Sequence, residues 1–186
     1  MKRILAAILA IVMIFSFAAC GKSTNPENKI IPDIRIEEIE WSVGAGTVKG
    51  ENYVLLEYTN GSQYAITSFE LKFTEKSKIS KENKDKFYLD LQKSQGYDDE
   101  YMQAFIESNE SLKQPITMYG RCEEEVGVGI ISPKIKCYYY GGLSSRDVIH
   151  SDLLTPKIAT IKYTKDGVKH TLYYNFESRL YDLEID

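Results

Sequence analysis

The sequence has little of the chemistry on which metal sites and nucleophilic catalysis depend, with two histidines and three cysteines in 186 residues. Neither His150 nor His170 has a second histidine or cysteine at metal-ligand spacing, which argues against a zinc site. The chain also lacks a Gly-x-Ser-x-Gly segment and an Asp-x-Asp-x-Asp-Gly loop, which argues against an esterase-type nucleophile and a calcium loop. We therefore expect no catalytic residue, no metal site and no cofactor.

A hydrolytic enzyme of another type stays open as an alternative. Asp147, His150 and Ser151 provide the residue types of a catalytic triad. Triads are, however, assembled from residues that are distant in sequence, so their closeness here argues against one. His170 lies on the apolar phase of an alternating segment, which predicts a structural role.

An excess of positive charge is also missing. The 23 basic and 27 acidic residues give a net charge of −4. Without residues 1–19, which contain Lys2 and Arg3, the net charge becomes 21 − 27 = −6. This balance argues against nucleic acid or an anionic membrane surface as an electrostatic partner, and it is compatible with a basic protein partner.

Long apolar stretches are absent except for one, which runs from Ile4 to Ala19 behind Lys2 and Arg3. A membrane-spanning helix needs about 20 apolar residues, and this run is slightly short. A short basic region, an apolar core and two small residues are typical of an export signal. A spanning segment is the alternative.

The four residues Phe17-Ala18-Ala19-Cys20 resemble the lipobox of bacterial lipoproteins, with Phe17 where leucine is commonest. The resemblance implies that the Cys20 thiol carries a diacylglyceryl group and that the signal peptide, residues 1–19, is removed. It also implies a protein anchored to the cell membrane and facing outside the cytoplasm. The high ratio of lysine to arginine suggests an AT-rich genome, as in many Gram-positive bacteria.

The remaining chain predicts a short tether and one domain. Residues 20–32 are mostly polar and predict a flexible tether that spans about 15–20 Å. Residues 33–186 are enough for a single core. Alternation of apolar and polar residues predicts seven or eight strands, with β-hairpins at Asn60-Gly61 and at Asp166-Gly167. A phase slip near Glu37-Glu38 predicts a bulge or bend.

Residues 80–110 follow a helical period instead, with expected N-caps at Ser80 and Asp98. The fold class that we expect is therefore mainly β, an immunoglobulin-like β-sandwich with a two-helix insertion. Tyr58 to Ser62 and Phe69 to Leu71 also resemble the small immunoglobulin-like domains of Gram-positive lipoproteins named for a Phe-x-Leu-Tyr-Asp pattern. Lys72-Phe73 replace the Tyr-Asp half. The resemblance implies a non-enzymatic envelope module.

Two features of the domain are candidate sites. Cys122 and Cys137 predict either a disulfide, which would close a loop of about 15 residues, or two separately buried thiols. Tyr138, Tyr140 and Tyr173 are expected to face outward, while Tyr139 and Tyr174 fill the core. The outward tyrosines predict a surface that binds an envelope protein or a glycan, or rings paired across strands under the helices.

These patterns together predict a membrane-anchored extracytoplasmic lipoprotein that works as a non-enzymatic binding module. The alternative is an inhibitor or immunity lipoprotein that blocks a basic hydrolase, which the size, the acidity and the cysteine pair favour. The length after Cys20 allows one domain, whereas solute-transport receptors usually have two.

Overall fold

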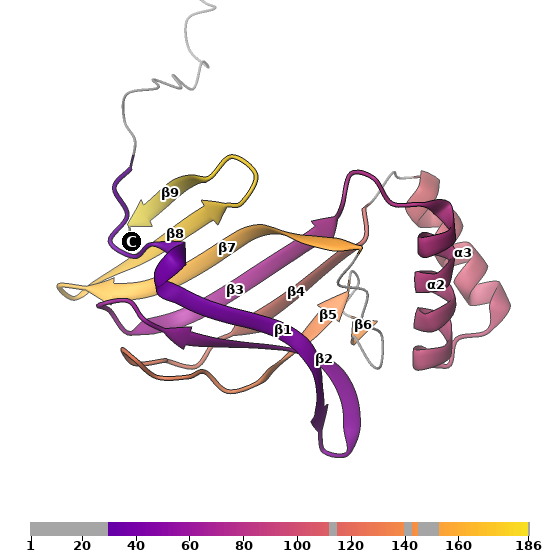
Figure 1. Ribbon diagram of the computed structural model, residues 1–186, viewed down its shortest axis with the longest axis horizontal. Coiled ribbons are helices and arrows are strands. Elements are labelled where there is room, and N and C mark those ends of the chain that lie inside the picture. The colour runs from indigo at the N-terminus through magenta and orange to yellow at the C-terminus, as the bar shows by residue number, and fades with distance from the viewer. Residues whose placement is uncertain (1–29, 112–114, 140–142, 145–152, 186) are drawn as a thin grey trace, which may run out of the picture.

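The structure is a computed structural model that describes residues 30–111, 115–139, 143–144 and 153–185 (Figure 1). Within these ranges the chain is mainly β, with two α-helices inserted between the third and fourth strands. The elements are the 3-10 helix η2 (Ile36–Glu38), β1 (Ile39–Val48), β2 (Glu51–Asn60), β3 (Ile66–Glu75), α2 (Lys81–Gln95), α3 (Asp99–Ser111), β4 (Thr117–Cys122), β5 (Ile135–Tyr139), β6 (Leu143–Ser144), β7 (Leu154–Lys165), β8 (Val168–Asn175) and β9 (Leu180–Ile185).

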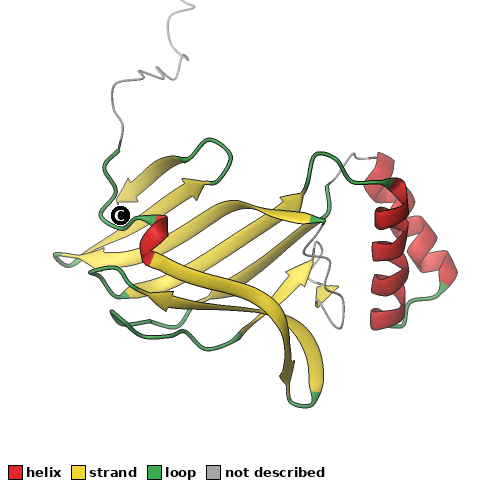
Figure 2. Cartoon of the chain, in the orientation of Figure 1, coloured by secondary structure: helices red, strands yellow, loops and turns green. Residues whose placement is uncertain are grey.

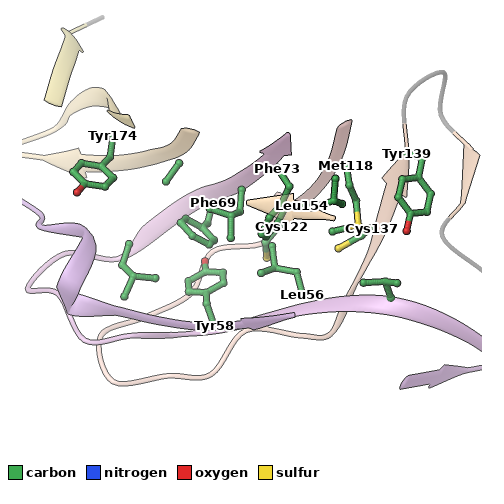
Figure 3. Packing of buried hydrophobic residues seen from close by; sticks show 14 of the residues in the cluster. Leu56, Tyr58, Phe69, Phe73, Met118, Cys122, Cys137, Tyr139, Leu154 and Tyr174 are labelled. Atoms are coloured by element: carbon green, nitrogen blue, oxygen red, sulfur yellow. The ribbon is translucent and has the colours of Figure 1, made fainter. Parts of the chain in front are cut away.

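The strands form one antiparallel sheet in the order β1-β2-β5-β4-β3-β7-β8-β9, and β6 pairs with β5 outside this path. The sheet folds over so that β1 and β2 lie across from β3. Tyr58 of β2 packs on Phe69 of β3 at 4.6 Å between ring centroids, and Trp41 of β1 lies 6.0 Å from Phe73. Figure 3 shows Tyr58, Phe69 and Phe73 between the two layers. The fold is therefore sandwich-like, as the alternating pattern predicted.

The predicted two-helix insertion is confirmed, and its caps are those expected from sequence. The Ser80 hydroxyl accepts a hydrogen bond from the Asn83 backbone N–H at 3.2 Å. The Asp98 carboxylate accepts one from the Tyr101 N–H at 2.7 Å. Gly96 ends α2 in the left-handed region at φ 70°, where glycine has no steric penalty.

The helices lie at one end of the sheet (Figure 2). Phe87 of α2 contacts Tyr139 of β5 at 5.1 Å between ring centroids. Tyr88 of α2 contacts Phe105 of α3 at 6.3 Å. The insertion thus extends the core beyond the sheet and leaves the outer face of β3, β4 and β7 to solvent.

The hairpin predicted at Asn60-Gly61 is wrong, because β2 pairs with β1 and β5 whereas β3 pairs with β4 and β7. Asn60 is fully buried and works as a corner residue. Its side-chain amide donates to the carbonyls of Tyr64 and Val126, and its amide oxygen accepts from Ser62. These bonds turn the chain from one layer to the other, so the two alternating segments face each other across the core.

The hairpin predicted at Asp166-Gly167 is confirmed as the β7–β8 connection. Asp166 and Gly167 have φ of 53° and 80°, as a two-residue hairpin turn requires. A second two-residue turn, at Lys49-Gly50, joins β1 to β2 with φ of 54° and 83°. The phase slip near Glu37-Glu38 corresponds to η2, a 3-10 turn and not a bulge.

No helix among the described residues is long and apolar enough to cross a membrane. Residues 1–29, including the predicted signal peptide and Cys20, lie outside the described ranges.

Candidate binding surface

The outer face of the sheet carries the candidate site, because the alternation of the strands places large polar side chains there. Phe69 and Leu71 of β3 point into the core, so Glu70 and Lys72 between them point outward. On β4, Met118 and Cys122 are buried, which directs Tyr119 and Arg121 to the same outer face. The register sets Glu70 opposite Arg121 and Lys72 opposite Tyr119.

Two tyrosines form a cross-strand pair on this face. Tyr119 of β4 is in register with Tyr138 of β5, and their ring centroids lie 5.9 Å apart. Both side chains are half-buried, so part of each ring is open to solvent. A pair of aromatic rings on rigid strands offers a large contact area that loses little side-chain entropy on binding.

Next to the tyrosine pair lies a carboxylate that is buried on what is otherwise a solvent-facing surface. Glu70 is only 5 % exposed. Arg121 bonds one of its oxygens through the guanidinium, and the Lys72 ammonium lies 3.2 Å from the other. The hydrogen bond and the charge of Glu70 raise the pKa of Arg121, so the guanidinium is fixed in its charged form. We call Lys72, Tyr119, Arg121 and Tyr138 the outer-face site.

The outer-face site combines apolar ring area with directed hydrogen-bond donors. Arg121 and Lys72 share the Glu70 carboxylate, and Glu123 forms a second ion pair with the guanidinium at 3.6 Å, so the charges of this cluster balance. Arg121 and Lys72 are about half exposed and keep donors for a ligand. Such a surface suits a partner that presents flat or apolar groups together with oxygen acceptors.

The structure separates the tyrosines that the sequence grouped together. Tyr138 faces outward as predicted, and Tyr139 and Tyr174 are buried as predicted. Tyr173 also faces outward, but it lies on β8, where its hydroxyl donates to Glu184 at 2.8 Å. Three strands stand between β5 and β8, which places Tyr138 and Tyr173 roughly 19 Å apart at about 4.8 Å per strand. Tyr140 lies outside the described residues.

Sequence reasoning missed three members of the outer-face site, Lys72, Tyr119 and Arg121. It also missed Glu70, the carboxylate that holds two of them. The sequence could have indicated Tyr119, because Met118 is apolar and points into the core, so the next residue along the strand points outward. The pairing of β4 with both β3 and β5 is a long-range feature that alternation alone does not specify.

A small cleft lies at the β1–β2 pair, where Gly44 has no atom within 4 Å of the place that a Cβ would take. It has a volume of about 120 Å³ and is lined by Ser42, Gly44, Ala45, Leu55, Glu57 and Lys134. Ligand pockets are usually about 300–1,000 Å³. The cleft is therefore too small for more than a few atoms of a ligand. The Gly44-Ala45-Gly46 segment lies inside strand β1.

Cys122 and Cys137 are thiols in the structure, buried on neighbouring strands β4 and β5. The residue opposite Cys137 is Gly120, so the two cysteines are diagonal neighbours. Diagonal neighbours lie about 7–8 Å apart, whereas disulfides join Cα atoms at about 4.4–6.8 Å. Burial raises the pKa of Cys137 to about 12, so this thiol stays protonated at neutral pH. The disulfide remains a prediction that would require a shift of these strands.

His170 shares the inner face of β8 with Leu172 and Tyr174, and its ring stacks on Tyr163 at 5.0 Å. His150, Asp147 and Ser151 lie outside the described residues. Within the described ranges, no three histidine, cysteine or acidic side chains gather as metal ligands.

Comparison of the chain with protein-family models, with curated proteins and with solved structures found no match.

Proposed function

We propose that the protein is an extracytoplasmic lipoprotein, anchored to the cell membrane through lipid on Cys20, and that its β domain works as a non-enzymatic binding module. The partner is an envelope protein or a glycan. The observation that carries the proposal is the solvent-open Tyr119–Tyr138 pair beside the buried Glu70 carboxylate, which forms ion pairs with both Lys72 and Arg121.

The arrangement of Glu70 supports binding more than stability. Burying a carboxylate costs free energy that an ion pair only partly offsets, so an apolar residue at this position would serve stability as well. A buried carboxylate that fixes two donor side chains beside an aromatic pair instead keeps those donors in place before a ligand arrives. Such preorganisation lowers the entropy cost of association.

The experiment uses the double variant Tyr119→Ala/Tyr138→Ala in the full lipidated chain. The matched control is Tyr97→Ala/Tyr101→Ala, which removes another tyrosine pair, with centroids 4.5 Å apart, from the helical insertion. Both variants and the parent protein are incubated with solubilised envelope proteins and, separately, with purified cell-wall glycan. Near-ultraviolet circular dichroism checks that each variant is folded.

We expect the parent and the control to retain a partner that the outer-face variant loses by tenfold or more, since each aromatic anchor contributes over about 1 kcal/mol. Equal binding by all three proteins would contradict the assignment of the outer face. Recovery of one basic hydrolase in stoichiometric amount would favour the inhibitor or immunity alternative.

A further inference from the structure

Most exposed large apolar side chains gather at one end of the sheet. Among the described residues, nine such side chains are exposed. Leu89 and Tyr101 are on the helices, and Leu180 begins β9. The other six form what we call the end patch: Ile31, Val128, Ile130, Ile131, Val168 and Ile185.

The strand register shows that these six belong to the same end. Val126, Ile66, Tyr163, His170 and Ile185 are successive cross-strand partners in one row across the sheet. Val128, Ile130 and Ile131 follow Val126 along the chain, and Val168 begins β8 next to the turn, two residues before His170. The helices lie at the opposite end (Figure 1).

The segment that leads back to Cys20 is fixed at this same end by Asp33. The Asp33 carboxylate accepts a hydrogen bond from the Tyr163 hydroxyl at 3.0 Å and pairs with the Lys165 ammonium at 2.7 Å. Ile31, two residues earlier, is 92 % exposed. The tether predicted for residues 20–32 would span roughly 15–20 Å. The end patch therefore lies within reach of a bilayer that holds Cys20.

The loop that presents three of the six side chains is held firmly. The Asn60 N–H donates to the Ile130 carbonyl at 3.0 Å, and the Gly129 N–H donates to the Asn60 carbonyl at 2.6 Å. The Ser132 N–H donates to the Tyr58 carbonyl at 2.8 Å. Gly129 has φ 73°, which a turn at this position needs. The backbone bonds thus keep aliphatic side chains in water where a collapse onto the core would otherwise bury them.

We propose that the end patch inserts its aliphatic side chains into the interfacial layer of the bilayer and so orients the domain on the membrane. This inference rests on the proposed lipid anchor at Cys20. The exposed Glu123, Glu124 and Glu125 lie beside the patch, so the contact is apolar and does not depend on anionic lipids. The outer-face site then stands at the side of the sheet and remains open to partners in the envelope.

The test places a single fluorescent label in the full lipidated chain, reconstituted in phosphatidylcholine vesicles that contain lipids with nitroxide groups on their acyl chains. Ile130→Cys labels the end patch, and Leu89→Cys labels a similarly exposed apolar position on α2 as the matched control. Cys122 and Cys137 are buried and do not compete for the label. Val128→Cys gives a second patch position should Ile130→Cys fold poorly. Flotation with the vesicles is measured on the same samples.

We expect both labelled proteins to float and the nitroxide lipids to quench the label at 130 at least about twofold, because interfacial side chains lie about 5–10 Å deep. The label at 89 should be unaffected, and added anionic lipid should change neither result. Flotation without selective quenching at 130 overturns the end-patch contact and leaves the lipid anchor standing. If the label at 130 is not quenched and the protein cross-links as a dimer through the end patch, the patch binds a second copy of the chain. That result also overturns the end-patch contact with the bilayer. Absence of flotation contradicts the anchor and the inference with it.

Discussion

At the scale of single residues, two tyrosine hydroxyls in the core have opposite effects on the stability of the fold. The Tyr58 hydroxyl is buried without a hydrogen-bond partner. Burial, and after it the Cys122 thiol, raise the pKa of Tyr58 above its ordinary value. The Tyr163 hydroxyl is also in a buried residue, but it donates to Asp33. The two tyrosines therefore differ in what their hydroxyl groups contribute.

Tyr58→Phe should stabilise the protein by about 1 kcal/mol, because it removes a polar group that is buried and unsatisfied. Tyr163→Phe should destabilise it by a similar amount, because it breaks a hydrogen bond to a charged group. Urea unfolding followed by circular dichroism measures both. A loss of stability in Tyr58→Phe equal to that in Tyr163→Phe would contradict the placement of the Tyr58 hydroxyl.

The two buried cysteines should not react with thiol reagents in the folded protein. The thiolate is the reactive form, and burial keeps Cys137 protonated far above neutral pH. After unfolding in guanidinium without reductant, we expect both thiols to react, with Cys20 blocked by its lipid. A disulfide between Cys122 and Cys137 would leave no reactive thiol, and this result would contradict the structure.

At the scale of elements, the contact between the layers depends on a glycine. A Cβ atom at Gly120 of β4 would lie 2.9 Å from Leu56 Cδ2 of β2 and 3.0 Å from Cys137 Sγ of β5. Distances this short require the neighbouring side chains or strands to move. A Cβ atom at Gly44 of β1 would have no other atom within 4 Å, so Gly44 offers a matched control on an exposed strand.

Gly120→Ala should destabilise the protein by about 1–3 kcal/mol, as overpacked core positions do. Gly44→Ala should change stability by less than about 0.5 kcal/mol, as most exposed substitutions do. Thermal unfolding of the two variants provides the comparison. Equal melting temperatures would mean that β2 and β4 do not pack as closely as the structure has them.

The sequence predicted elements well and long-range pairings poorly. Ser80, Asp98 and the 166–167 turn were predicted because caps and tight turns depend on a few neighbouring residues. The Asn60-Gly61 segment matched a hairpin pattern equally well, yet it is a corner. What decides between the two is the burial of Asn60 and its bond to the Val126 carbonyl, 66 residues away. The same limit explains why Tyr138 was found and its partner Tyr119 was not.

At the scale of the whole molecule, Asp33 fastens the beginning of the domain to the far end of the β7–β8 hairpin. The pKa of Asp33 lies below its ordinary value, mainly because its carboxylate accepts a hydrogen bond from Lys165. Burial opposes this shift, and the hydrogen bond from Tyr163 adds to it. A carboxyl with a lowered pKa binds fewer protons in the folded state than in the unfolded state. Its contribution to stability is therefore present at neutral pH and is lost as the pH falls through about 4 and below.

Asp33→Asn should accordingly lower stability at pH 7 and make the decline of stability below about pH 5 less steep. Denaturant unfolding at a series of pH values measures the slope. Lys162→Met, a change on the outer face of the same strand β7, serves as a control that leaves the acid slope unchanged. Parallel acid slopes for Asp33→Asn and the parent would contradict the role of this carboxylate.

The orientation of the molecule on the membrane follows from the features that lie at the two ends of its sheet. The sheet has its helical insertion at one end and the end patch, with the segment toward Cys20, at the other. A lipid on Cys20 would therefore hold the domain by its apolar end and leave the outer-face site accessible from the side.

The lipid anchor on Cys20 is tested most directly by the intact mass of the protein extracted from bacterial membranes. We expect a chain of 186 − 19 = 167 residues that begins at Cys20 and carries the mass of a diacylglyceryl group. Cys20→Ser should give an unprocessed chain without that added mass. A membrane-bound protein that begins at Met1 and has no lipid mass would contradict the anchor.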